Sequence, residues 1–165
     1  MNGVPVFDRI IDLLTRENAA FRVIEHEPEG RSDRISVIRG NKPDQAAKAM
    51  VLDVRGGGGG RRHVLAILPG NRKIDFDAVA RHFGARKCGF ANPETAQQIT
   101  GCAMGSVPPF SFNEALAVLV EPDLLKHATI FFNAGRLDRS MELDTETWLR
   151  VVKPAAVRIA VDDLT

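Results

Sequence analysis

The ten residues Gln45–Val54, Gln-Ala-Ala-Lys-Ala-Met-Val-Leu-Asp-Val, constrain the fold of this chain more than any other stretch. Side chains alternate between the two faces of a strand, and here both faces are mostly apolar, with small or β-branched residues. This pattern is typical of a central strand that is covered on both sides. Lys48 is the exception, because removing an ammonium group from water is costly unless the group is paired. The residues alone leave two interpretations: Lys48 reaches water at the strand end, or it serves a functional site.

Five consecutive glycines, Gly56–Gly60, follow this strand, and the apolar stretch His63–Leu68 comes shortly after them. The glycines do not match a phosphate-binding P-loop, because neither the Lys-Ser/Thr pair nor the helix of that motif follows. We therefore expect a β-hairpin with a flexible glycine tip. If the hairpin closes symmetrically about Gly58, Lys48 lies opposite Leu68, at the end far from the glycines.

Helices and strands follow one another irregularly along the chain. Apolar spacing and capping residues predict helices at 5–17, 32–40, 75–84, 92–101 and from 144 or 145 onward. Further strands are predicted at 21–25, 86–90, 115–120, 129–132, 140–143 and 156–161. Because strand and helix do not alternate steadily, we expect an α+β fold: a single domain over 1–165, with a mixed, largely antiparallel, barrel-like sheet wrapped by helices.

Composition and motifs exclude several classes of function. The net charge is +1, so any nucleic-acid contact must be local rather than spread over a strongly basic surface. No apolar run approaches the roughly 18 residues of a membrane span and no signal peptide is present, which predicts a cytoplasmic protein without membrane attachment. Cys88 and Cys102 are expected to be reduced, buried and unreactive. The four histidines lack metal-binding spacing, so we expect neither a metal nor a cofactor.

The loop Gly101–Phe110 is the second unusual stretch. Two consecutive prolines restrict the backbone and push Val107 toward an extended conformation, while Gly105 permits a sharp turn. Such a loop can present the N–H groups of Gly105, Ser106 and Val107 as an anion or oxyanion site. From the pattern alone, a stiff connector between a helix and a strand is the simpler interpretation.

Four cations follow one another between the first strand and the central strand. Arg31, Arg34, Arg39 and Lys42 could form a patch that faces phosphate, although solvated surface is the default for such charges. No nucleophile elbow and no supported cysteine–histidine pair is found elsewhere. The residues alone thus indicate an α+β domain with one unusual lysine and one rigid loop that carries amides.

Five segments of the chain, in order from about His26 to the C-terminus, resemble the YbaK/prolyl-tRNA-synthetase-associated (ProX-type) trans-editing domain family. These segments are His26–Pro28 with Ser32, Gln45–Val51, Leu68–Asp75, Thr100–Phe110 and Phe131–Gly135. The two best markers are the strand lysine, Lys48, and a G-x-x-x-P loop from Gly105 to Pro109. The glycine run is not part of the family pattern.

The resemblance implies a deacylase that acts in trans and hydrolyses the ester of mischarged tRNA. It implies removal of small amino acids such as alanine, serine, threonine or cysteine, chiefly from proline tRNA. An aminoacyl ester is already activated, so a positioned water can suffice without a metal. The expected partners are the terminal adenosine and aminoacyl ester of tRNA, and a synthetase in a transient complex. The alternatives are a non-catalytic module that binds aminoacyl-tRNA or a nucleotide in the same pocket, and a small-molecule hydrolase unrelated to tRNA.

The same resemblance assigns roles to individual residues. Lys48 would hold the ribose or phosphate of the terminal adenosine, and the amides from Gly105 to Val107 would bind the carbonyl or α-amine region of the substrate. Lys48 and Gly105 are therefore the expected catalytic residues. The expected substrate-binding residues are His26, Ser32, Ser106, Val107, Pro109, Asn133 and Gly135.

Overall fold

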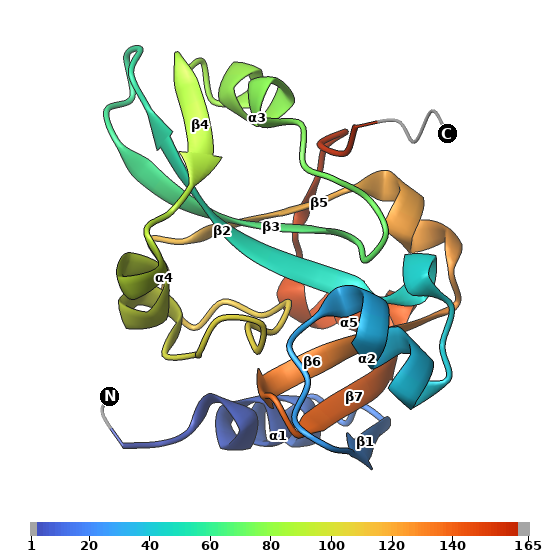
Figure 1. Cartoon of the computed structure of the whole chain (residues 1–165). Helices are drawn as coiled ribbons and strands as arrows, with labels where there is room; N and C mark the ends of the chain where they lie inside the picture. The colour runs from blue at the N-terminus through green and yellow to red at the C-terminus, as the bar shows by residue number, and fades with distance from the viewer. Residues whose placement is uncertain (1–2, 162–165) are drawn as a thin grey trace.

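The computed structural model describes residues 3–161, whose strands form two sheets that pack around a shared core (Figure 1). The first sheet is antiparallel, in the order β1 (Phe21–Glu25), β7 (Arg139–Asp144) and β6 (Thr129–Arg136). The second is mixed, in the order β4 (Lys87–Phe90), β2 (Ala47–Arg55), β3 (Arg62–Pro69), β5 (Ala117–Val120) and β8 (Ala155–Ala156). The α+β class and the largely antiparallel pairing are confirmed, but the described strands do not close into a barrel.

Helices cover these sheets at the five places that the sequence predicts. They are α1 (Val6–Arg16), α2 (Ser32–Arg39), α3 (Phe76–His82), α4 (Pro93–Thr100) and α5 (Thr145–Val152). Two short 3₁₀ helices, η1 (Pro43–Gln45) and η2 (Pro122–Lys126), precede β2 and β6. Within residues 3–161, no helix combines the length and the apolar character that a membrane span requires.

Capping residues explain where some of these helices begin. The side chains of Asp75 and Asn92 each accept a main-chain N–H in the first turn of α3 and α4, as the sequence predicts. The predicted start of the helix at 32–40 rests on Ser32 as its capping residue, and this role is wrong. The extended residue before the helix is Arg31, so Ser32 already belongs to the first helical turn.

The predicted strand at 156–161 is largely wrong, since β8 ends at Ala156. The N–H groups of Ile159 and Ala160 both donate to one carboxylate oxygen of Glu121, at 2.9 Å, instead of to a neighbouring strand. Glu121 is buried, and a buried carboxylate requires such donors. A single acid on the turn after β5 therefore interrupts the pairing of the C-terminal segment, which resumes only as an isolated antiparallel bridge between Ala160 and Ile74.

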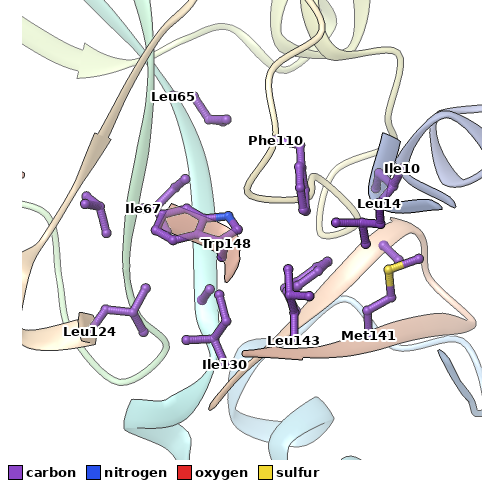
Figure 2. Close-up of a cluster of buried hydrophobic side chains, with 14 of the residues drawn as sticks. Ile10, Leu14, Leu65, Ile67, Phe110, Leu124, Ile130, Met141, Leu143 and Trp148 are labelled. Atoms are coloured by element: carbon purple, nitrogen blue, oxygen red, sulfur yellow. The ribbon is translucent and has the colours of Figure 1, made fainter. Parts of the chain in front are cut away.

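The main core lies between the two sheets and is closed by α1 and α5 (Figure 2). Trp148 of α5 is fully buried beside Ile67 of β3, and its indole N–H donates to the carbonyl oxygen of Pro109 at 2.9 Å. A second cluster, which contains Leu52 and Val79, lies on the other face of the β2–β3 hairpin beneath α3. Both faces of β2 are thus covered, as predicted for a central strand.

The register of the hairpin places Lys48 opposite Leu68, as predicted. On its other side β2 pairs with β4, but only over Leu52–Arg55. The preceding part of β2, Ala47–Val51, has no neighbouring strand there. This unpaired edge is where the cavity described below opens.

The glycine tip of the hairpin packs against the turn between α3 and β4, which the prediction of a flexible tip did not anticipate. The N–H of Arg86 donates to the carbonyl oxygen of Arg55 at 3.1 Å. At Gly57, φ is +77°, and a Cβ atom would lie 2.2 Å from the carbonyl oxygen of Gly84. Gly58 has no such restriction, because a Cβ atom there would meet nothing within 4 Å.

We therefore predict that Gly57→Ala destabilises the protein by about 1–3 kcal/mol, since it adds backbone strain and a main-chain clash. Gly58→Ala is the matched control on the same tip and should stay within about 0.5 kcal/mol of the wild type. Urea unfolding of the two variants measures the difference. Equal free energies of unfolding for both variants would contradict the packing of the tip.

Candidate active site

A cavity of about 530 Å³ lies at the unpaired edge of β2, between α2, α4 and the loop 101–110. This is a size that ligand sites of proteins commonly have. Alanines of β2 and α4, together with Met50 and Phe132, make most of its wall apolar. The polar side chains on the wall are Ser32, Arg39, Lys48, Gln97 and Asn133. No described aspartate or glutamate lines the cavity, so its ionisable polar groups are cations.

The structure brings five of the nine sequence-predicted site residues together on this wall. They are Ser32, Lys48, Gly105, Val107 and Asn133. The other four do not line the cavity, and their hydrogen bonds join residues behind its wall. They are His26, Ser106, Pro109 and Gly135.

Lys48 is half-buried on β2, and its Nζ donates to the carbonyl oxygen of Arg72 at 2.6 Å. Burial, and to a smaller extent the nearby charge of Lys73, lowers the pKa of Lys48 below its ordinary value. Its side chain is therefore held at the cavity by a neutral acceptor rather than by a carboxylate. This position differs from that of a lysine whose amine simply extends into water.

The loop 101–110 is held against the rest of the protein by main-chain contacts. The N–H of Gly135 donates to the carbonyl oxygen of Ser106 at 2.9 Å, and the Trp148 indole holds Pro109. Ser106 is 1% exposed, and its hydroxyl donates to the carbonyl oxygen of Ala103 at 2.7 Å. These contacts support the loop from behind and involve Ser106, Pro109 and Gly135. None of the three lines the cavity, so the geometry favours a structural role over direct contact with a ligand.

Gly105 is restricted to glycine by its conformation and by its neighbour. Its φ is +86°, and a Cβ atom would lie 2.8 Å from the Cα of Gly30. The loop therefore passes the segment before α2 too closely to leave room for a side chain at Gly105. This contact fixes the part of the loop that faces the cavity.

Two amides of this loop are available to a ligand. The N–H groups of Gly105 and Val107 have no acceptor among residues 3–161, and both residues line the cavity. The N–H of Ser106, between them, donates to the carbonyl oxygen of Ala103 at 3.0 Å. The predicted row of three free amides is thus reduced to two, because the middle one closes the turn.

A hydrogen-bond network connects the loop to α2 and to the first sheet. Asn133 donates through Nδ2 to the carbonyl oxygen of Gly105 and accepts from Arg39 Nη1 at 3.2 Å. Ser140 also accepts from Arg39 Nη1, at 3.2 Å. His26 Nε2 lies 2.7 Å from the Ser140 hydroxyl, while its Nδ1 lies 2.8 Å from the carbonyl oxygen of Glu27. Since a carbonyl oxygen only accepts, Nδ1 carries a proton. The single hydrogen of the Ser140 hydroxyl has two possible acceptors, His26 Nε2 and Asn133 Oδ1, which lies 3.3 Å from it.

The unpaired edge of β2 adds main-chain groups to the wall. The carbonyl oxygen of Val51 accepts from the N–H of Ala91 on this side of the strand. Main-chain groups two residues apart on a strand point to the same side, so the N–H and C=O of Ala49 face the cavity. Phe90 and Met104, which are 62% and 73% exposed, form an apolar rim at its entrance.

Cys102 lines the cavity but is held in its protonated form. Burial raises the pKa of its thiol to about 11, so little of the nucleophilic thiolate exists at neutral pH. Burial also raises the pKa of Cys88 to about 11. Among residues 3–161, no cluster of three or more His, Cys, Asp or Glu side chains is placed to bind a metal ion.

Several wall residues carry no recognisable signal in the sequence. Phe90 and Met104 belong to elements that look like ordinary strand and loop, and only the tertiary structure leaves them exposed at one entrance. Arg39 stands among other cations in the sequence. Its position as the last residue of α2, directly before a glycine, is the signal that could have distinguished it.

Comparison with known proteins places the chain in one family. The model of the aminoacyl-tRNA editing domain matches residues 26–151. The multifunctional Ser/Thr-tRNA deacylase ProXp-y of Escherichia coli K12 is 40% identical over 156 residues, which cover 94% of this chain and 93% of that protein. The protein of the same name from Escherichia coli O157:H7 matches equally well.

Solved structures share the fold. A candidate trans-editing enzyme for prolyl-tRNA synthetase superposes with a TM-score of 0.79 at 22% identity, over 98% of this chain and 100% of the other. The hypothetical protein APE2540 superposes with a TM-score of 0.82 at 14% identity, over 93% and 99%. At these identities the two structures establish the common architecture alone.

The lowered pKa of Lys48 yields a prediction for the stability of Lys48→Met. At a pH below the pKa that Lys48 has in the folded protein, the amine is charged in the folded and in the unfolded state, and burying the charge destabilises the fold. As the pH rises toward 10.5, the ordinary pKa, the folded protein loses this proton and the destabilisation disappears. Methionine avoids the penalty but loses the hydrogen bond to Arg72. We expect Lys48→Met to lie within about 1 kcal/mol of the wild type at pH 7, and the wild type to gain on it as the pH approaches 10.

Urea unfolding at both pH values measures this change. Lys87→Met removes an exposed lysine from β4 and controls for net charge. A wild type that loses stability relative to Lys48→Met on going from pH 7 to pH 10 would show that the sign is wrong.

Proposed function

Because the chain belongs to the aminoacyl-tRNA editing domain family, we propose that its cavity binds the 3′ end of mischarged tRNA and hydrolyses the aminoacyl ester there. Family membership makes trans-editing deacylation of mischarged tRNA the activity of this chain. We propose in addition which residues form the site, which tRNA carries the ester and which amino acids are removed. Since this activity is hydrolysis, we set aside the alternative of a module that binds aminoacyl-tRNA without hydrolysing it.

One observation supports this location above all others: among residues 3–161, the cavity holds two cations and two free amides, but no acidic side chain. The 3′ end of an aminoacyl-tRNA brings a phosphate, a polar ribose and an ester carbonyl. Donors fixed in an apolar surrounding suit such a ligand, because they interact with negative charge more strongly there than in water.

Each polar group then has a role in ester hydrolysis. Lys48 holds the ribose or phosphate of the terminal adenosine, and the amides of Gly105 and Val107 donate to the ester carbonyl. The carbonyl oxygen of Ala49 accepts from the α-amine, for which the described lining residues offer no carboxylate. Phe90 at the rim offers a surface on which the adenine base stacks.

The reaction itself requires only a positioned water. The water oxygen bonds to the ester carbon while the carbonyl π pair moves to the carbonyl oxygen, and the bond to the ribose oxygen then breaks. One proton of the water ends on that ribose oxygen. Cys102 takes no part as a nucleophile, since its thiol stays protonated.

We further propose that serine and threonine are among the amino acids removed, as the name of the 40% identical relative states for that protein. Hydroxyl-bearing and other small side chains fit beside a nucleoside in a cavity that must hold both. Proline tRNA is the proposed carrier, and we place the reaction in the cytoplasm with transient contact to a synthetase. The solved structure described as a trans-editing enzyme for prolyl-tRNA synthetase has the same fold, which supports this proposal.

A panel of mischarged proline tRNAs tests the substrate. We expect esters of serine, threonine and alanine to be hydrolysed well above the uncatalysed rate, and the phenylalanine ester much more slowly, because a pocket excludes a large group by clash. Release of the labelled amino acid is measured against time. Equal rates for phenylalanine and serine would contradict a site for small amino acids.

Lys48→Met also tests the proposed role of the lysine. The variant should stay folded, and its single-turnover deacylation should fall sharply because the contact to ribose or phosphate is lost. The exposed-lysine variant Lys87→Met should keep wild-type rates. A stable Lys48→Met protein with wild-type turnover would remove Lys48 from the site.

A further inference from the structure

Arg39 is the one cation of its sequence cluster that turns into the cavity. Arg31 pairs with Asp33 on the surface, at 2.9 Å, and Arg34 and Lys42 are exposed. Arg39 is the last residue of α2, where Gly40 ends the helix in a left-handed conformation. The helix end therefore directs this one side chain toward the first sheet.

The guanidinium of Arg39 is fixed on two of its three nitrogens. Its Nε donates to Asn41 Oδ1 at 2.9 Å, and its Nη1 donates to Asn133 and Ser140. Asn41 is held in turn, because its Nδ2 donates to the Ser36 hydroxyl and to the carbonyl oxygen of Lys42. The orientation of the guanidinium is thus set before any ligand binds.

The third nitrogen, Nη2, has no acceptor among residues 3–161. No buried side-chain nitrogen or oxygen in this range lacks a partner, so Nη2 must be open to solvent. Arg39 is one of the residues that line the cavity, and the cavity is therefore the space in which a ligand could reach this nitrogen. The two N–H bonds of Nη2 are the donors of this fixed cation that remain for a ligand.

Within residues 3–161, the acceptors of Arg39 are all neutral. Burial lowers its pKa to about 10, so it stays charged at neutral pH without a carboxylate partner. The carbonyl groups at the end of α2 offer only a partial negative charge. A half-buried cation without a carboxylate partner among residues 3–161 destabilises the fold, so a function that uses the charge would explain why the site contains it.

The network also places this charge beside the loop. Asn133 joins the Arg39 guanidinium to the carbonyl oxygen of Gly105, next to the two free amides. Lys48 is bound elsewhere on the wall, to the carbonyl oxygen of Arg72. The cavity thus has two separate positive positions, and the one formed by Arg39 belongs to the loop that carries the amides.

We propose that Arg39 Nη2 donates to the carbonyl oxygen of the scissile ester and stabilises the negative charge that develops there when water attacks. This inference rests on the function proposed above. Arg39 keeps its proton throughout: the carbonyl π pair moves to the oxygen, returns when the bond to the ribose oxygen breaks, and the leaving oxygen receives a proton that came from the water. Because the full charge exists only near the transition state, the interaction raises kcat more than it lowers KM.

The test compares two substrates that differ in phosphate. One is proline tRNA carrying serine, and the other is the serine ester of adenosine, which has the same carbonyl and no phosphate. We expect Arg39→Met to lower kcat by about 10²–10³ on both esters, with little change in KM. Arg34→Met removes the same charge from the exposed side of the same helix and should match the wild type on both.

The other outcomes overturn the inference. Wild-type kcat of a folded Arg39→Met protein shows that the cation is not used, and a defect confined to KM of the tRNA substrate shows that Arg39 binds phosphate instead. Failure of the proposed function is separate, because then the wild type itself hydrolyses neither ester.

Chemical rescue keeps the test decisive if Arg39→Met folds poorly. In Arg39→Ala, millimolar guanidinium ion should restore a part of kcat on serine-adenosine, whereas urea, which is similar in shape but neutral, should not. Equal rescue by both compounds would assign Arg39 a packing role and contradict the proposal.

Discussion

The register between β2 and β3 is the constraint on which the rest of this structure depends. Successive side chains of a strand point to opposite faces, so a shift of one residue would move Lys48 into the main core and bring Val51 out of it. In the observed register Ala47 and Val51 face the core between the sheets, while Leu52 and Val54 pack in the second cluster. Because both faces of β2 are buried beyond residue 50, no other register satisfies them together.

The site exists because one strand is too short to cover its neighbour. β4 pairs with the distal half of β2 and then gives way to α4, so the chain from Ala47 to Val51 keeps a free edge. A free edge of this kind ordinarily invites pairing with another strand. Here the loop 101–110 and α2 stand opposite the edge and leave a cavity between them. The close approach of Gly105 to Gly30, just before α2, brings the loop and this segment together, and a side chain at Gly105 would separate them.

The sequence predicts the fold well where the pattern is local. Alternation on β2, the apolar stretch of β3 and the caps of α3 and α4 each follow from residues that interact within a few positions, and all of them are observed. Prediction fails where a distant group decides: Glu121 interrupts the C-terminal strand, and Gly84 determines the packing of the glycine tip. The site shows the same division. Lys48 and Gly105 stand out by their residue type, but whether Ser106 or Asn133 faces the cavity depends on contacts with residues that are far away in the sequence.

The chemistry of the wall explains how one cavity can serve ester hydrolysis with so few groups. A thiol lines it, yet burial keeps that thiol protonated, so covalent attack by Cys102 is disfavoured. What the fold holds in place instead are donors: two cations bonded only to neutral acceptors, and two amides that the loop leaves free. Donors that are oriented in advance do not reorganise during the reaction, and for this reason they stabilise a developing charge better than water does. Within residues 3–161, Lys48 and Arg39 are half-buried without a carboxylate partner, which lowers the stability of the fold. The same arrangement keeps both cations free to stabilise negative charge on an activated ester, so the loss of stability serves the function.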